Sequence, residues 1–440
     1  MHISLDSALG RQRRLNSVGE SVLQIAPNAA AAYSLRSLTG GDPKVVRVRR
    51  KSDNAERDFT ASGVTSGALT SFVNEDVTIY QSDFSAGVNG FVQTSTTTAT
   101  GNQDGVSDSA GTSKDNVLKV VKAADSQGYM QRDQGVVAGL TYTVSGSFFA
   151  PASNTAVDGI MIKDGLAGSS LSNYPSGYLV SDGTWKDFSF SYTAASDGNQ
   201  RVQLGISSLG SNPNGSSTGS SGDIVYIADL KFVETISNGF VETWYDQSGN
   251  SKDATQATAS LQPKIVNAGS LLTDGIDFDG TDQVGLVTGS FSLTQAFTTF
   301  SVSHTDDAST SLGIWSTAAS ATDNFNTASF FRNDDGFAVN AGATLTTAGT
   351  IDYVADRTYL QTNVVNGGSS SIFVDGATGE TGNAGSTNPS GVLIIGYFKS
   401  GGYLNLDGAI KELIIYDSDQ TSNREALETN IAAANGVTLS

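Results

Sequence analysis

Short stretches in which apolar and polar residues alternate run through most of the chain, separated by turns rich in Gly, Asp, Asn and Ser. The segment Gly239–Trp244, with the sequence GFVETW, alternates in this way and predicts a half-buried strand. Residues 246–250, DQSGN, predict a tight turn after it, because Gly249 and Asn250 accept positive φ. The same combination of strand and polar turn recurs along the sequence, so we predict an all-β protein.

The predicted strands fall into two groups. One group surrounds a central block and comprises 44–50, 275–278, 298–304, 312–315, 329–332, 358–365, 371–374, 392–397 and 409–416. The other lies inside the block and comprises 117–121, 140–149, 187–192, 201–206 and 223–233.

Three segments are predicted to be helices and not strands: 27–38, 68–73 and 421–434. The first begins with Pro27, which suits the first turn of a helix. The last is amphipathic, with Ser422 and Glu425 spaced as a capping box and Gly436 at its C-terminal end.

The strand pattern is interrupted at both ends of 77–235. Joining the residues before and after this block restores one continuous β-domain, so we predict that the block is an insertion. The domains are then an N-terminal attachment arm (1–26), a host β-sandwich (27–73 and 236–440) and an inserted all-β domain (77–235). The predicted fold is two β-sandwiches, one inserted into the other, with an N-terminal arm and a short C-terminal helix. A chain of 440 residues is also too long for one ordinary core.

The amino-acid composition limits the kinds of catalytic and metal-binding site that the chain can form. The sequence has no cysteine, which excludes disulfides and thiolate catalysis, and its two histidines are His2 and His304. A histidine-based triad or multi-histidine metal site is therefore not expected. No apolar run reaches the roughly 18 residues of a membrane span, and the N-terminus lacks the apolar stretch of a secretory signal. No phosphate loop or basic–aromatic pattern points to nucleic acid.

Charge is unevenly distributed. Residues 1–57 hold 10 Lys/Arg against 5 Asp/Glu, whereas the remainder holds 15 against 39, for a net charge of −19. Such asymmetry is typical of a basic arm that docks on a partner. Arg11, Arg13 and Arg14 are candidates for this contact, and the alternating KVVRVRR at 44–50 would add an outward basic face. A solvated tail is the alternative.

The inserted block resembles the jelly-roll carbohydrate-binding modules of the cellulose- and xylan-binding type. The resemblance is carried by DFS (83–85), LTYTVS (140–145), DGTWKDFSFSYTA (182–194) and DIVYIADLKFVE (223–234). It implies that the first and last strands lie side by side, as an inserted domain requires. It also implies that Asp83 and Asp229 lie where related modules often hold a structural calcium.

The host domain resembles the laminin-G/concanavalin-like sandwich, in the version found in the catalytic domain of arabinofuranosidase B and in bacteriophage virion proteins. The most specific segment is FVETWYDQSGNSKDATQA (240–257), with GIDFDGTDQ (275–283) and the C-terminal strand and helix (406–436) in support. A retaining mechanism of this family needs two carboxylates roughly 5 Å apart. The region that matches the nucleophile, 316–331, offers only Asp323, and the region that matches the acid/base, 394–402, offers Lys399. The resemblance therefore implies the fold and argues against an enzyme.

Asp277, Asp279 and Asp282 form a D-x-D-x-x-D pattern that offers oxygen ligands to Ca²⁺, although acidic turns beside strands are common without a metal.

Tyr129, Tyr174 and Tyr178 lie in polar, glycine-containing segments. An exposed aromatic ring there can stack on a sugar, and packing in the core is the alternative for each of them.

These observations predict a non-enzymatic structural protein of a bacteriophage virion, a tail-fibre or capsid-decorating component. It would be attached to other virion proteins by its basic arm, would be a homo-oligomer as such fibres often are, and would bind host surface polysaccharide. The first alternative is a glycoside hydrolase with displaced carboxylates, Asp323 and Asp407. The second is a secreted bacterial lectin or adhesin.

Overall fold

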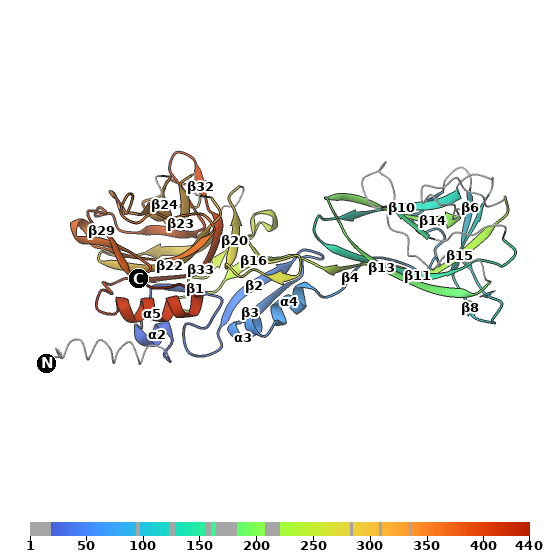
Figure 1. Ribbon diagram of the computed structural model, residues 1–440, viewed down its shortest axis with the longest axis horizontal. Helices are drawn as coiled ribbons and strands as arrows, with labels where there is room; N and C mark the ends of the chain where they lie inside the picture. Colours follow the sequence, from blue (N-terminus) through green and yellow to red (C-terminus); the bar gives the residue numbers. More distant parts are fainter. Residues whose placement is uncertain are drawn as a thin grey trace. The chain divides into compact units, whose positions relative to one another are not determined.

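The computed structural model describes residues 19–93, 97–122, 128–154, 160–163, 183–206, 221–281, 285–307, 310–333 and 336–440. The chain divides into two compact units (Figure 1). Unit 1 comprises the chain up to Val73 together with Asn238–Ser440, and unit 2 comprises Asn74–Ser237. The boundaries predicted at 77 and 235 lie within three residues of this division. Both units consist mainly of antiparallel strands, which confirms the predicted all-β fold.

Unit 1 is built on one large curved antiparallel sheet. Its strands are β1 (Ala31–Ser34), β2 (Lys44–Arg50), β3 (Glu56–Thr60), β16 (Gly239–Trp244), β17 (Ala254–Thr255), β18 (Lys264–Asn267), β19 (Ser270–Leu271), β20 (Ile276–Asp279), β21 (Leu286–Ser292), β22 (Phe297–Thr305), β23 (Leu312–Ala318), β24 (Thr327–Phe331), β25 (Phe337–Asn340), β26 (Thr344–Thr346), β27 (Arg357–Val365), β28 (Ser370–Val374), β29 (Ala377–Gly382), β30 (Ser390–Ile395) and β33 (Asp407–Tyr416). A small hairpin, β31 (Tyr397–Lys399) and β32 (Tyr403–Asn405), completes the described strands of this unit. Every strand predicted for the host from alternation has a counterpart here.

The described helices of unit 1 are short: α2 (Val22–Ile25), α3 (Ala61–Thr65), α4 (Ala68–Val73), α5 (Arg424–Asn435) and the 3₁₀ turns Ala259–Leu261 and Gly367–Ser369. None of the helices in this part of the chain has the length and apolar character needed to cross a membrane. Figure 1 shows α2 and α5 together beside β22 and β33. Val22, Leu427 and Ile431 are buried there against Phe300, in a core separate from the one between the sheet layers.

The prediction that residues 1–26 form an N-terminal attachment arm is wrong for its last part, which packs into unit 1. Helix α2 and Ala26 belong to the buried cluster beside α5. Arg11, Arg13 and Arg14 lie outside the described residues, so their docking role stays a prediction.

The helix predicted for 27–38 is also wrong. Residues 31–34 form β1, which pairs with β33 from Ala31↔Ile415 to Ser34↔Glu412, and all four of its residues are buried. The helix propensity of alanine is worth less than about 1 kcal/mol per residue. Ladder hydrogen bonds and burial therefore outweigh it.

The C-terminal helix is confirmed, but its predicted capping box is not. Asn423, and not Ser422, is the N-cap residue, so Glu425 lies at the second helical position and not at the third, where a capping box needs it. Asn423 itself makes no side-chain cap bond. Its end is as predicted: Gly436 takes a left-handed φ of 72° and its N–H donates to the Ala432 carbonyl.

The predicted turn at 246–250 forms hydrogen bonds to the backbone of residues 29–38, in the segment that precedes the insertion. The Asp246 carboxylate accepts from the Ala32 N–H at 2.9 Å and from the Lys252 N–H at 3.0 Å. The Gln247 amide accepts from the Leu38 N–H at 2.8 Å and donates to the carbonyls of residues 34 and 36 at 3.0 Å. Asn250 donates to the Ala29 carbonyl at 2.8 Å. One loop thus satisfies buried backbone groups from residue 29 to residue 38.

The chain re-enters unit 1 at a point that accepts only glycine. A Cβ atom at Gly239 would lie 2.9 Å from a methyl carbon of Val73 and 3.1 Å from one of Val48. The absence of a side chain lets β16 pair with β2 there, with Gly239 opposite Arg50.

The basic strand at 44–50 is confirmed, but it is not the free docking face that the sequence suggested. Arg49 and Arg50 are buried, and they donate to Gln262 and to Asp53, respectively. Arg47 donates to the Asp58 carboxylate at 2.8 Å. The side chains of Arg47, Arg49 and Arg50 thus form hydrogen bonds to other residues of unit 1.

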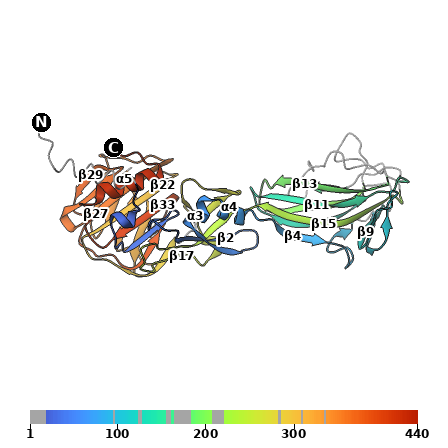
Figure 2. The ribbon, with the colours of Figure 1, turned by 90° about the horizontal axis from the view of Figure 1, so that it is seen from below.

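Unit 2 is a sandwich of two sheets, one of four and one of six strands (Figure 1). The six-stranded sheet faces the viewer in Figure 2. Its strands are β4 (Val77–Ser82), β5 (Val92–Gln93), β6 (Thr97–Gln103), β7 (Val106–Ser107), β8 (Ser113–Lys114), β9 (Val117–Lys122), β10 (Gly128–Val136), β11 (Thr141–Phe149), β12 (Ile160–Lys163), β13 (Trp185–Thr193), β14 (Gly198–Ile206) and β15 (Ile224–Ile236). The four-stranded sheet has the order β12-β14-β10-β5, and the six-stranded one contains β13-β11-β15-β9-β6 with β4 beside β15. The first and last strands are adjacent, Val77 opposite Glu234, as an inserted domain requires.

A buried glutamate of β33 connects the segment after β1 with α5: Glu412 pairs with Arg36 and also accepts from Asn435 Nδ2 of α5 at 3.2 Å. Glu412 is 1% exposed and accepts from Arg36 Nε at 2.8 Å and Nη2 at 2.9 Å. Arg36→Met is expected to lower the free energy of unfolding by about 2–3 kcal/mol, because a buried carboxylate loses its charged partner. Urea denaturation measures this loss. The double variant Arg36→Met/Glu412→Leu should recover most of it, and a single variant as stable as the parent chain would contradict the account.

Asp58 gives unit 1 a pH dependence. Partial burial opposes ionisation, but hydrogen bonds from Lys44, Arg47 and Tyr245 outweigh it and hold the pKa of Asp58 far below its ordinary value. Burial and the bond to Asp58 raise the pKa of Tyr245 to about 12.

A carboxylate with a depressed folded pKa stabilises above its unfolded pKa, about 3.9, and loses that effect as the pH falls toward the folded value. The difference in unfolding free energy between the parent chain and Asp58→Asn should therefore be constant from pH 7 to about pH 5 and shrink below about pH 4. Urea denaturation across this range measures it. A difference that does not change with pH would contradict the assignment.

Candidate functional site

The outer face of the four-stranded sheet of unit 2 is polar. Met130, Val202 and Leu204 of β10 and β14 are buried and face the core. Since side chains alternate along a strand, Gln131, Asp133 and Arg201 face outward, and each of these three is at least partly exposed.

Strand register brings these polar residues into one row. Asp133 lies opposite Arg201, and the guanidinium donates to both carboxylate oxygens, at 2.7 and 2.9 Å. The bond to Arg201 lowers the pKa of Asp133, so the pair stays charged. On the next strand Val92 lies opposite Gln131 with 62% of its surface exposed. We call Val92, Gln131, Asp133 and Arg201 the polar face.

The face combines a fixed cation, a carboxylate, an amide and an apolar side chain. Planar guanidinium and amide groups offer several donors at fixed angles, and the carboxylate offers acceptors. A ligand that carries many hydroxyl groups can use both kinds. The bidentate pair also restricts both of its side chains before any ligand binds.

The three predicted tyrosines are only partly placed. Tyr129 belongs to β10, with its backbone opposite Gly205, so it lies in the four-stranded sheet and not in a loop. The placement of its side chain, and of Tyr174 and Tyr178 altogether, lies outside the described residues. Their sugar-stacking roles stay predictions. The alternation of Met130 and Gln131 marks the outward face in the sequence, but the pairing of Asp133 with a residue 68 positions away is not readable from it.

In unit 1, acidic residues gather where β20, β33 and β22 run together. Asp279 lies opposite Asp407, and the Asp306 N–H donates to the Asp407 carbonyl at 3.0 Å. Burial raises the pKa of Asp277, and nearby carboxylates, that of Asp306 first among them, add to the rise. The same two causes raise the pKa of Asp407.

The predicted calcium ligands of unit 1 are placed only in part. Asp277 and Asp279 share β20, while Asp282 lies outside the described residues. In unit 2 the Asp83 carboxylate accepts from the Ser85 N–H at 3.0 Å, and Asp229 accepts from Lys114 Nζ at 2.9 Å. Calcium at either place stays a prediction.

Among the described residues, one group of three or more side chains brings potential metal ligands within 4.8 Å of one another: His304, Asp306 and Asp356. The pattern did not suggest it, because Asp356 lies far along the sequence.

The two segments predicted to correspond to catalytic regions, 316–331 and 394–402, are in contact. The Phe325 N–H donates to the Lys399 carbonyl at 3.0 Å, and Lys399 Nζ donates to the Thr322 carbonyl at 2.6 Å. Asp323 accepts from Ser320 Oγ at 2.7 Å in the same turn. The meeting point holds a carboxylate and an ammonium group, and the other candidate, Asp407, is grouped with Asp279 and Asp306 instead.

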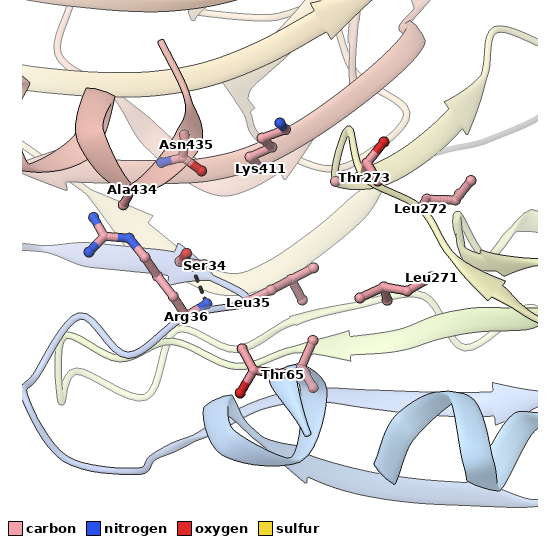
Figure 3. Close-up of a pocket in the computed structure, with 12 residues that line it drawn as sticks. Ser34, Leu35, Arg36, Thr65, Leu271, Leu272, Thr273, Lys411, Ala434 and Asn435 are labelled. Atoms are coloured by element: carbon pink, nitrogen blue, oxygen red, sulfur yellow. Dashed lines mark hydrogen bonds between the residues drawn. The ribbon is translucent and has the colours of Figure 1, made fainter. Parts of the chain in front are cut away.

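Unit 1 also has a pocket of about 320 Å³ between β1, α3, β19, β33 and the end of α5 (Figure 3). Leu35, Leu271 and Leu272 supply an apolar lining, with Thr65 and Lys411 also on its walls. Its volume is at the small end of the range for ligand sites.

No model of a protein family matches this sequence, and no curated protein does. Among solved structures, a sialidase from Trypanosoma rangeli is 15% identical over 45% of this chain and 32% of its own, with a TM-score of 0.31. The CBM22-1 xylan-binding domain of Paenibacillus barcinonensis Xyn10C is 11% identical over 36% of this chain and 95% of its own, with a TM-score of 0.27. A SAP-like pentraxin from Limulus polyphemus is 13% identical over 37% and 84%, with a TM-score of 0.27.

The chain thus matches about a third of the length of the sialidase. The similarities are distant, and at these identities and TM-scores none of them carries an inference about ligand or activity. None of the three is an arabinofuranosidase or a virion protein, so those two resemblances stay predictions.

Proposed function

We propose that the chain is a non-enzymatic glycan-binding structural protein that recognises a polysaccharide on the polar face of unit 2. The observation that carries this proposal is the partly exposed row of Gln131, Asp133 and Arg201, with the exposed Val92 beside it. Sugars present hydroxyl groups that both donate and accept, together with apolar C–H faces. The polar face offers partners for all of these.

An open sheet face that extends over several strands suits a polymer better than a small molecule. Strands of this sheet run side by side with a spacing of about 4.8 Å, so four strands span several sugar rings. Hydrogen bonds to the charged Asp133–Arg201 pair would fix the orientation of one ring.

The proposed location of the protein, in a virion, rests on the sequence. The basic residues Arg11, Arg13 and Arg14 and the resemblance of the host domain to bacteriophage proteins support attachment to a virion as a tail-fibre or capsid-decorating component. The proposed location is the virion, the proposed partners are other virion proteins, and the proposed assembly is a homo-oligomer. Finding the chain by mass spectrometry in purified particles would support this setting, and its absence from them would oppose it.

Absence of glycosidase activity is part of the proposal. A retaining mechanism needs two carboxylates about 5 Å apart, whereas the matched segments bring Asp323 beside Lys399. A hydrolase that uses Asp323 and Asp407 is the second candidate. Sugar release from arabinoxylan that disappears in the double variant Asp323→Ala/Asp407→Ala would establish that candidate instead.

The polar face can be tested by glycan-array binding of the full chain. Arg201→Ala is expected to weaken binding at least about tenfold, because it removes charge-assisted hydrogen bonds and frees Asp133. Its effect on stability should be below about 1 kcal/mol, since the pair is partly exposed.

Thr143→Ala is the matched control. Thr143 forms a hydroxyl pair with Ser191 at 2.7 Å on the six-stranded sheet, so the variant loses a surface hydrogen bond away from the polar face. It should bind as the parent chain does. Equal binding by Arg201→Ala, or binding lost only in tyrosine variants outside the polar face, would move the site elsewhere.

A further inference from the structure

One end of the β22–β27 ladder in unit 1 concentrates metal-binding side chains. Thr305 lies opposite Arg357 in the antiparallel register, so the next residues outward, Asp306 and Asp356, lie across from each other. The Asp356 N–H donates to the Thr305 carbonyl at 2.8 Å and holds this extension of the ladder. His304 is two residues before Asp306 and therefore shares its face.

The three side chains lie near one another. His304 Nε2 lies 2.9 Å from an oxygen of Asp306, and ligand atoms of His304, Asp306 and Asp356 all lie within 4.8 Å of one another. Two ligand atoms bound at about 2.1 Å to a tetrahedral ion lie about 3.4 Å apart. Binding therefore requires small rotations of the two exposed carboxylates toward a common point.

The surroundings hold the imidazole in place. The side chain of His304 is 13% exposed, and its Nδ1 lies 3.5 Å from Thr358 Oγ1. The neighbouring cation, Arg357, is directed elsewhere: its guanidinium donates to Asp375 at 2.7 Å and stacks on Tyr359.

We propose that His304, Asp306 and Asp356 bind one divalent first-row transition ion, with Zn²⁺ as the ion that this donor set favours. One imidazole nitrogen and two carboxylate oxygens are ligands that zinc accepts, and they leave a fourth position for water. Calcium takes six to eight oxygen ligands and fits the set poorly. The site lies in unit 1 and is independent of the glycan-binding proposal.

Bound zinc would fasten the residues after β22 to the turn before β27. The sequence contains one other histidine, His2, which makes a sharp experiment possible. The test is calorimetric titration of the full chain with zinc sulfate, with the His2→Ala variant as the reference protein. We expect one zinc per chain in the reference protein and no comparable binding of Ca²⁺.

In that background, His304→Ala is expected to abolish the zinc signal and Asp356→Asn to weaken binding at least tenfold. Asp352→Asn is the matched control, because Asp352 lies in the same connection but accepts from the Gly349 N–H at 2.9 Å. Urea denaturation checks that His304→Ala is folded, and His304→Asn serves as a second variant if it is not.

Three results would overturn the proposal. The first is no zinc binding by the His2→Ala protein. The second is binding that survives His304→Ala or His304→Asn in a folded chain. The third is calcium binding as strong as zinc binding, which would indicate a site made of carboxylates alone.

Discussion

The hydrogen bonds made by the 246–250 loop are the constraint on which unit 1 depends. The unit is made of two chain segments separated by 74–237, and those segments must find each other across the insertion. Asp246, Gln247 and Asn250 accept from and donate to the backbone between residues 29 and 38, which would otherwise be buried without partners. Trp244 packs against Tyr33, with ring centroids 5.6 Å apart, and so adds an aromatic contact between the same two chain segments. We call this region of contact the junction.

This junction explains how the chain tolerates so large an insertion. The ends of unit 2 leave it on adjacent strands, β4 and β15, and the chain returns to unit 1 at Gly239, where a side chain would collide with Val73. The insertion therefore requires little change in the host domain beyond a glycine at position 239. Arg49 and Arg50 are buried and, like the Arg47–Asp58 pair, form hydrogen bonds within the host, so the basic strand contributes to its fold.

Alternation made the strands predictable, and β22, β27 and β33 lie where it placed them, although both faces of these three strands are largely buried. It failed for 27–38, where four consecutive buried residues of β1 resemble an alanine-rich helix. The candidate sites were harder to predict from the sequence than the strands, since each site depends on the register in which two strands pair. Arg201 meets Asp133, and Asp356 meets Asp306, only because particular strands pair, and no local pattern specifies that pairing.

Hydrogen–deuterium exchange on the full chain with Asp246→Ala tests the central claim, that this loop holds the segment before the insertion. The account predicts that amide protection falls across residues 30–38, because the Ala32 N–H loses its acceptor and the turn that positions Gln247 loosens. Protection of β11 in unit 2 should not change. Unchanged protection of residues 30–38 in the variant would contradict the claim.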